Sequence, residues 1–148
     1  MTTTVINDYR PGYHELFANH ITRKCGWERQ YTDLVIEDAL RFLTICTQHP
    51  DEHLVSSQDV DEIVDALVLD TALLAWLEEN VWEGKKITHI PNYAHDQIER
   101  ARLNTAYTIT IEYMRENGPV NPQIWRELSD TYGPCVIANC RTCGVKAA

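Results

Sequence analysis

Apolar residues recur every three or four positions along most of the chain, which is the spacing of one face of an α-helix. The pattern is strongest between Tyr31 and Pro50, where the expected buried face is Ile36, Ala39, Leu40, Leu43 and Cys46. It continues after the polar loop at 51–58, with an expected inner face of Val60, Ile63, Val64, Leu67, Val68 and Thr71. A weaker stripe, Phe17 and Ile21 with His14, predicts a helix over residues 13–25.

Residues that start or stop helices divide these stretches. Gly26 is expected to end the first helix, and Thr32 is the expected N-cap of the second. Pro50 ends the second helix, and the third begins near Ser56 or Ser57. The apolar pattern runs on to Gly84, so we expect a kink or break near Asp70.

The C-terminal half predicts two more helices. Asn92 is placed to cap a long segment that stops at Gly118. Within it, residues 106–113 alternate β-branched and polar side chains as a strand would, but their flanks are helical and we expect a helix. Asn121 and Pro122 predict a final helix that ends at Gly133. The predicted fold class is therefore all-α: a single domain, residues 1–148, of five to six helices with an irregular Cys-rich tail at 133–148.

Charge is distributed unevenly. Between Arg41 and Lys85 there are ten acidic residues and no Lys or Arg, so the formal charge of this segment alone is more negative than the net charge of −9. The rest of the chain sums to +1. Direct binding to nucleic acid is disfavoured, because it depends on clustered basic residues. The first ten residues lack the pattern of a secretory signal, and no apolar run is long enough to cross a bilayer. We expect a cytoplasmic protein with reduced thiols.

Four acidic residues of this segment are candidates for binding a partner: Asp59, Asp61, Glu62 and Asp65. Asp61 and Asp65 are one helical turn apart, and we expect them to point outward with Glu62, opposite the apolar face. The simplest interpretation is that this acidic face of the helix is exposed to water. The absence of basic residues to balance it also favours contact with a basic protein partner or a divalent cation, and it could imitate nucleic acid as an inhibitor does.

Three of the five cysteines, Cys135, Cys140 and Cys143, lie in the tail. A structural zinc ion needs four ligands, so His89 or Cys25 would have to complete the site. Free thiols, a disulfide or an iron–sulfur cluster are the alternatives.

Four segments occur in an order that resembles a bacterial family, the glycine-rich-domain-containing-protein-like proteins: "RFLTICTQHP", "HLVSSQDVDEIVDALVLDT", "WEGKKITHIPNY" and "TIEYMRENGPVNPQIW". The resemblance covers about residues 31–125 and implies a mostly helical fold but no activity. Where the family has Trp-His-x-His, this chain has residues 64–67, Val-Asp-Ala-Leu, and Thr88 replaces the first of a later pair of histidines, leaving His89. If the family uses those histidines in a metal or catalytic cluster, this chain has lost most of it.

Two hypotheses of function follow. No phosphate-binding glycine loop, nucleophile elbow or dinucleotide fingerprint is present, which favours a helical interaction or regulatory module with a tail that holds zinc. The alternative is a divergent metal-dependent enzyme whose site is built from Asp65, His89 and the tail cysteines.

Overall fold

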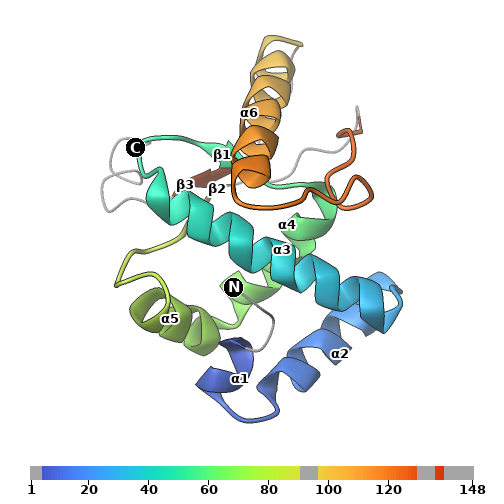
Figure 1. Ribbon diagram of the computed structural model, residues 1–148, viewed down its shortest axis with the longest axis vertical. Helices are drawn as coiled ribbons and strands as arrows, with labels where there is room; N and C mark the ends of the chain where they lie inside the picture. Colours follow the sequence, from blue (N-terminus) through green and yellow to red (C-terminus); the bar gives the residue numbers. More distant parts are fainter. Residues whose placement is uncertain (1–4, 91–96, 130–135, 139–148) are drawn as a thin grey trace.

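Six helices and a small sheet make up the computed structural model, which describes residues 5–90, 97–129 and 136–138 (Figure 1). The helices are α1 (Val5–Tyr9), α2 (Tyr13–Cys25), α3 (Arg29–Gln48), α4 (Gln58–Leu69), α5 (Thr71–Asn80) and α6 (Gln97–Glu116). The strands are β1 (Leu54–Val55), β2 (Thr88–Ile90) and β3 (Val136–Ala138). The predicted all-α class is confirmed. No helix in these ranges is long and apolar enough to span a membrane.

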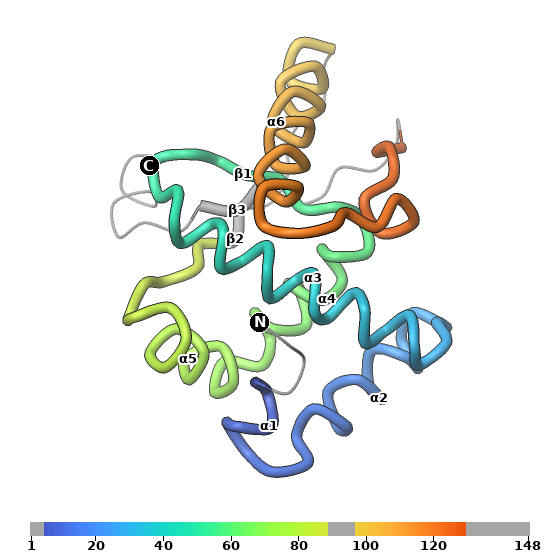
Figure 2. The backbone as a smooth tube through the Cα atoms, viewed as in Figure 1, coloured from blue at the N-terminus to red at the C-terminus, as the bar shows by residue number. Residues whose placement is uncertain are grey.

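Helix α3 crosses the middle of the molecule. It contacts α2 and α4, and it also contacts α6 (Figures 1 and 2). Because α3 has neighbours on more than one side, its buried residues are not confined to one face of the helix. They are Thr32, Val35, Ile36, Ala39, Leu40, Phe42, Leu43, Ile45, Cys46 and Thr47. Each large apolar side chain buried here stabilises the fold by about 1.5–3 kcal/mol relative to its exposed state. The helix therefore organises the core.

Three predicted helix boundaries are confirmed. Gly26 ends α2 in the left-handed region, with φ 71°, and its N–H donates to Thr22 O. Ser57 caps α4 by accepting a hydrogen bond from Val60 N at 3.2 Å. Asp70 separates α4 from α5 and caps the second of them, since its Oδ1 accepts from Leu73 N at 3.3 Å.

The predicted cap at Thr32 is wrong. Helix α3 starts at Arg29, after Glu28, and Thr32 is fully buried inside the first turns. Its hydroxyl lies 2.9 Å from Thr22 Oγ1 and also donates to Glu28 O. Thr32 thus joins α2 to α3 instead of ending a helix.

The predicted helix after Asn121 is also wrong over the residues described, because only one turn forms there. Ile124 N and Trp125 N both donate to Asn121 O, and the chain is irregular from Arg126 to Ser129. Trp125 Nε1 donates to Asp38 Oδ2 at 2.9 Å, and Arg126 binds Asp59. These contacts hold the segment against α3 and α4 in a conformation that does not continue as a helix.

The three strands form an antiparallel sheet in the order β1–β3–β2. Strands at β1 and β3 were not predicted. Helix α6 packs beside β1, and residues 106–113 are helical as predicted. Apart from β3, the tail at 133–148 and the proposed cap at Asn92 lie outside the described residues.

Candidate interaction groove

The acidic residues of α4 are not a continuous outward face. Asp61 is 4% exposed, so the expectation that it points outward is wrong, and Asp59 is buried as well, at 8% exposed. Both lie in the first turn of α4, where the helix dipole favours negative charge, and Ser56 Oγ donates to Asp61 Oδ1 at 3.5 Å. Glu62 and Asp65 are half-buried, and Glu62 pairs with Lys24 at 3.2 Å.

Asp59 is instead the centre of a polar cluster that joins α3, α4 and the segment after α6. Arg126 donates to both of its oxygens, from Nη1 at 2.8 Å and from Nη2 at 3.0 Å. The Tyr31 hydroxyl also donates to Asp59 Oδ2. Burial, and then the hydrogen bond to Asp59, raise the pKa of Tyr31, which keeps the phenol protonated as a donor. The pKa of Arg126 is raised as well, chiefly by its hydrogen bonds to Asp59.

This cluster forms one wall of a surface groove of about 470 Å³. The groove is lined by Trp27, Glu28, Gln30, Tyr31, Leu34, Asp59, Gln123 and Arg126. The Trp27 and Tyr31 rings meet edge to face with centroids 5.3 Å apart, and Leu34 is 48% exposed. Asp59 and Arg126 balance each other, so the lining carries one unbalanced negative charge, on Glu28. An aromatic surface beside a carboxylate suits a cation with an apolar stem.

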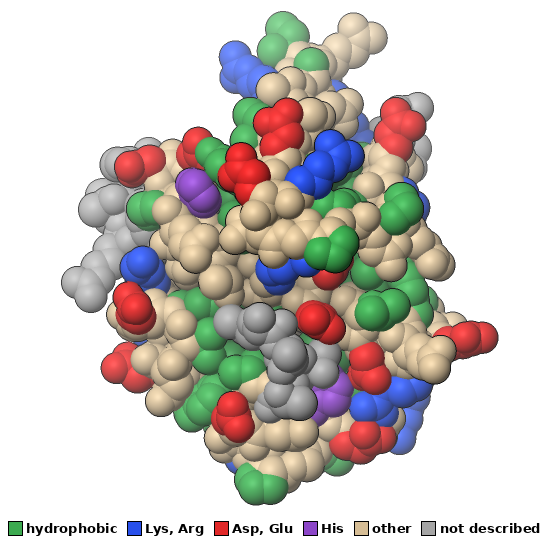
Figure 3. Space-filling view, in the orientation of Figure 1, with side chains coloured by type: hydrophobic (Ala, Val, Ile, Leu, Met, Phe, Trp, Pro, Cys, Tyr) green, Lys and Arg blue, Asp and Glu red, His purple; other side chains and the backbone are tan. Residues whose placement is uncertain are grey.

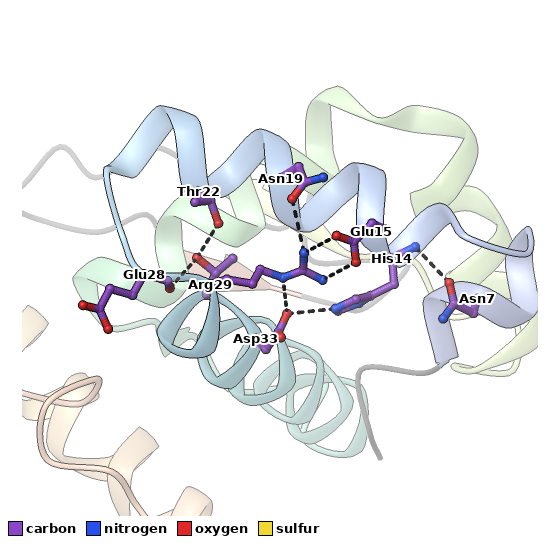
Figure 4. A network of polar contacts seen from close by, with 9 residues as sticks. Asn7, His14, Glu15, Asn19, Thr22, Glu28, Arg29 and Asp33 are labelled. Carbon is purple, nitrogen blue, oxygen red and sulfur yellow. Dashed lines mark hydrogen bonds and ion pairs between the residues drawn. The ribbon is translucent and has the colours of Figure 1, made fainter.

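A network of ion pairs between α2 and α3 fixes the start of α3 (Figure 4). Arg29 donates to both oxygens of Glu15, at 2.6 and 2.8 Å, and its Nε donates to Asp33 at 3.0 Å. His14 Nε2 lies 3.0 Å from the same Asp33 oxygen. These contacts hold Arg29 against α2, whereas the side chain of Glu28 points away from the network (Figure 4). Among the described residues, the pairing of Arg29 therefore leaves the groove-lining carboxylate of Glu28 without a salt bridge.

Of the predicted metal ligands, Cys135, Cys140 and Cys143 lie outside the described residues, and His89 lies in β2 opposite Ile137 of β3. Cys25 is the last residue of α2, and its thiol donates to Glu62 Oε2 at 3.9 Å. Burial and the Glu62 carboxylate raise the pKa of Cys25, which disfavours the thiolate form that binds zinc.

Cys25 and His89, the two described candidates for a fourth ligand, belong to different elements, α2 and β2. Within the part of the chain that the structure describes, no three His, Cys, Asp or Glu side chains are grouped to hold a metal ion. The enzyme hypothesis built on Asp65 and His89 thus gains no support from these residues.

Sequence analysis did not single out Trp27, Glu28, Tyr31 or Arg126. The available signal was a second apolar stripe, Trp27, Tyr31 and Leu34, at intervals of four and three residues on the side of α3 away from Ile36. Nothing local indicated that Arg126 would reach Asp59, which is 67 residues away in the chain.

Comparisons with known proteins identify no relative: no family model, no curated protein and no solved structure matches this chain. The resemblance to the glycine-rich-domain-containing-protein-like family therefore stays a prediction. The groove has to be interpreted from its own residues.

Proposed function

We propose that the protein is a small helical interaction module that binds a basic segment of a protein partner in the groove at Trp27 and Tyr31. The observation that carries this proposal is the carboxylate of Glu28 beside these two rings. Within the described part of the chain, that carboxylate makes no ion pair. The net charge of −9 adds a long-range attraction for a basic partner. On the face shown in Figure 3 the acidic side chains are scattered among basic ones and form no single patch.

A lysine or arginine side chain fits the chemistry of the lining. Its methylene groups pack on Leu34 while its cation approaches Glu28 and the face of an aromatic ring. Such a cation–π contact contributes about 0.5–1 kcal/mol at an exposed site. Arg126 repels the incoming cation little, because Asp59 binds its guanidinium group through two hydrogen bonds.

The test is an NMR titration of the full chain with an acetylated, amidated oligolysine peptide and with the oligoglutamate peptide of equal length. The chain has four tryptophans, and the Trp27→Phe variant assigns the indole signal that is followed. We expect saturable shifts of the Trp27 signal with oligolysine alone, and weaker binding at high salt.

A matched pair of variants separates the groove from general attraction. Glu28→Gln should weaken oligolysine binding roughly 2- to 5-fold, which corresponds to about 0.5–1 kcal/mol. Glu37→Gln removes one charge from an exposed position within α3 and should leave binding unchanged. Equal effects of the two substitutions, or equal shifts with oligoglutamate, would refute a specific groove.

A structural zinc ion in the tail remains part of the proposal. The support is the register of the sheet: β3 pairs with β2 so that Ile137 is opposite His89, and β3 lies between Cys135 and Cys140 in the sequence. Elemental analysis of protein purified without added metal should find zinc in the wild type and in Cys25→Ser, and no zinc in Cys140→Ser. A metal-free wild type would end this part of the proposal.

A further inference from the structure

The rings of Trp27 and Tyr31 meet at a right angle in the groove described above. Their interplanar angle is 89°, and the ring centroids lie 5.3 Å apart. Both rings line the groove, so a group seated between them contacts two aromatic surfaces at once. Leu34, which is 48% exposed, adds an apolar contact one turn further along α3. Two aromatic rings arranged as a corner suit a cation that is covered by methyl groups.

The corner formed by the two rings is held in place by the surrounding structure. The Tyr31 hydroxyl donates to Asp59 Oδ2, and Arg126 holds the same carboxylate through two hydrogen bonds. Trp27 lies in the short connection between α2 and α3, and ion pairs join these two helices at the start of α3. Because both rings are ordered beforehand, a ligand loses little affinity to the cost of fixing them.

The charged groups of the lining favour a cation that needs no hydrogen bonds. An ordinary lysine ammonium has three N–H donors and is strongly hydrated. Asp59 already accepts hydrogen bonds from Arg126 and Tyr31, so Glu28 is the carboxylate of the described lining that is left to accept from an ammonium. Trimethylation of a lysine keeps its positive charge and removes all three donors. The methyl groups can then contact the rings while Glu28 still attracts the charge.

We propose that the groove selects a trimethylated lysine side chain in the basic segment of its protein partner. The quaternary ammonium group lies in the corner between Trp27 and Tyr31, and the methylene stem packs on Leu34. The groove of about 470 Å³ has room for the stem as well as for the charged group. This inference rests on the function proposed above, because it names the side chain that the same groove holds.

A preference for the trimethylated side chain distinguishes the rings from general charge attraction. A primary ammonium donates charge-assisted hydrogen bonds to carboxylates, which a trimethylammonium group cannot do. An acidic surface without the rings would therefore bind unmodified lysine at least as well. Tighter binding of the trimethylated form requires a contact with the aromatic faces.

The first test is an NMR titration of the full chain with oligolysine and with the fully trimethylated peptide of equal length and charge, both acetylated and amidated. Binding is followed through the backbone amide of Leu34. We expect the trimethylated peptide to bind roughly 3- to 10-fold more tightly, as a partly desolvated cation–π contact would produce. Free choline should bind much more weakly than the trimethylated peptide, because it has no lysine stem to pack on Leu34.

The second test compares Trp27→Leu with Trp76→Leu. Trp76 on α5 is also half-buried beside a tyrosine, with its ring centroid 5.8 Å from that of Tyr9, but it does not line the groove. Trp27→Leu keeps an apolar side chain and removes one ring, so the preference for the trimethylated peptide should fall below about twofold. Trp76→Leu should keep the wild-type preference. Circular dichroism checks that both variants are folded.

The outcomes separate this inference from the proposed function. Saturable binding of oligolysine with no gain on trimethylation would overturn the inference and leave the proposed function in place. Binding of neither peptide would overturn both. The inference also fails if the two tryptophan variants change the preference equally, or if choline binds as tightly as the trimethylated peptide. The wild-type titration alone can overturn it, whether or not a variant folds.

Discussion

The backbone N–H of Val55 donates to the hydroxyl of Thr110, 55 residues away, at 2.9 Å. Thr110 is fully buried, and its hydroxyl in turn donates to Ala106 O within α6. Strand β1 is at the edge of the sheet and pairs with β3 on one side only. Thr110 therefore accepts a hydrogen bond from the buried Val55 N–H, which has no partner within the sheet.

Replacing this threonine by valine should destabilise the fold. Thr110→Val keeps the shape but leaves the Val55 N–H without an acceptor, which costs about 1–3 kcal/mol. Thr108 is the control: its hydroxyl donates to Asn104 O in the same way, but the residue is exposed. Urea unfolding should show a clear loss for Thr110→Val and little change for Thr108→Val. Similar losses in the two variants would contradict this role.

Gly118 should tolerate substitution poorly. Its φ is +143°, a region that residues with side chains rarely adopt. A Cβ there would lie 2.8 Å from Arg41 Nη1, and Arg41 Nη2 donates to Pro119 O at 2.8 Å. Gly12→Ala is the control, since φ is +78° but no heavy atom lies within 4 Å of the added carbon. We expect Gly118→Ala to lower the free energy of unfolding by about 1–2 kcal/mol more than Gly12→Ala.

The pair of Asp59 and Arg126 should couple strongly in a double-mutant cycle. Arg126→Met leaves the Asp59 carboxylate, whose side chain is 11% exposed, with Tyr31 as its remaining described donor. The cost should be about 2 kcal/mol, below that of fully buried pairs because the Arg126 side chain is 45% exposed. Asp59→Asn in the Arg126→Met background should cost much less than Asp59→Asn alone. Additive losses, measured by chemical unfolding, would show that the two residues act independently.

Tyr13 should titrate at a higher pH than an ordinary tyrosine phenol. Its hydroxyl donates to Asp70 Oδ2 at 2.6 Å, and this hydrogen bond, followed by burial, raises the pKa from 10.0 to about 12. Because the folded-state pKa is the higher one, the contribution to stability is complete below pH 10 and is lost as the pH rises towards 12.

NMR of ¹³Cζ-labelled tyrosine measures this titration directly. Asp70→Asn removes the charge while keeping a residue that caps helices well, so the pKa of Tyr13 should fall towards 10. An unchanged Tyr13 titration in Asp70→Asn would show that the carboxylate does not control it.

Helix boundaries were predictable from the sequence where the determining contact is local. The left-handed turn at Gly26, the cap at Ser57 and the break at Asp70 each depend on residues within four positions. The helical state of residues 106–113 was also predicted, because the sequence on both sides of that segment has the pattern of a helix. Strands of two or three residues have no periodicity to detect, and β1 and β3 were accordingly missed.

The groove could not be predicted because its determinants are distant in the sequence. A helix beginning at Pro122 was a sound local interpretation, but Asp38 and Asp59 bind the side chains of Trp125 and Arg126 and hold the segment as a single turn. Those same contacts bury Asp59, which the sequence had offered as a residue for binding a partner. Contacts between residues distant in the sequence thus explain both the absence of the expected helix after Asn121 and the burial of Asp59.

The middle position of β3 in the sheet has a consequence for folding during synthesis. Strands β1 and β2 do not pair with each other. Each pairs with β3, which the ribosome makes more than forty residues after β2. Until that strand leaves the exit tunnel, the nascent chain can assemble its early helices but not its sheet. Completion of the fold therefore requires residue 138 to emerge from the ribosome, and both outer strands lack their partner in the interval.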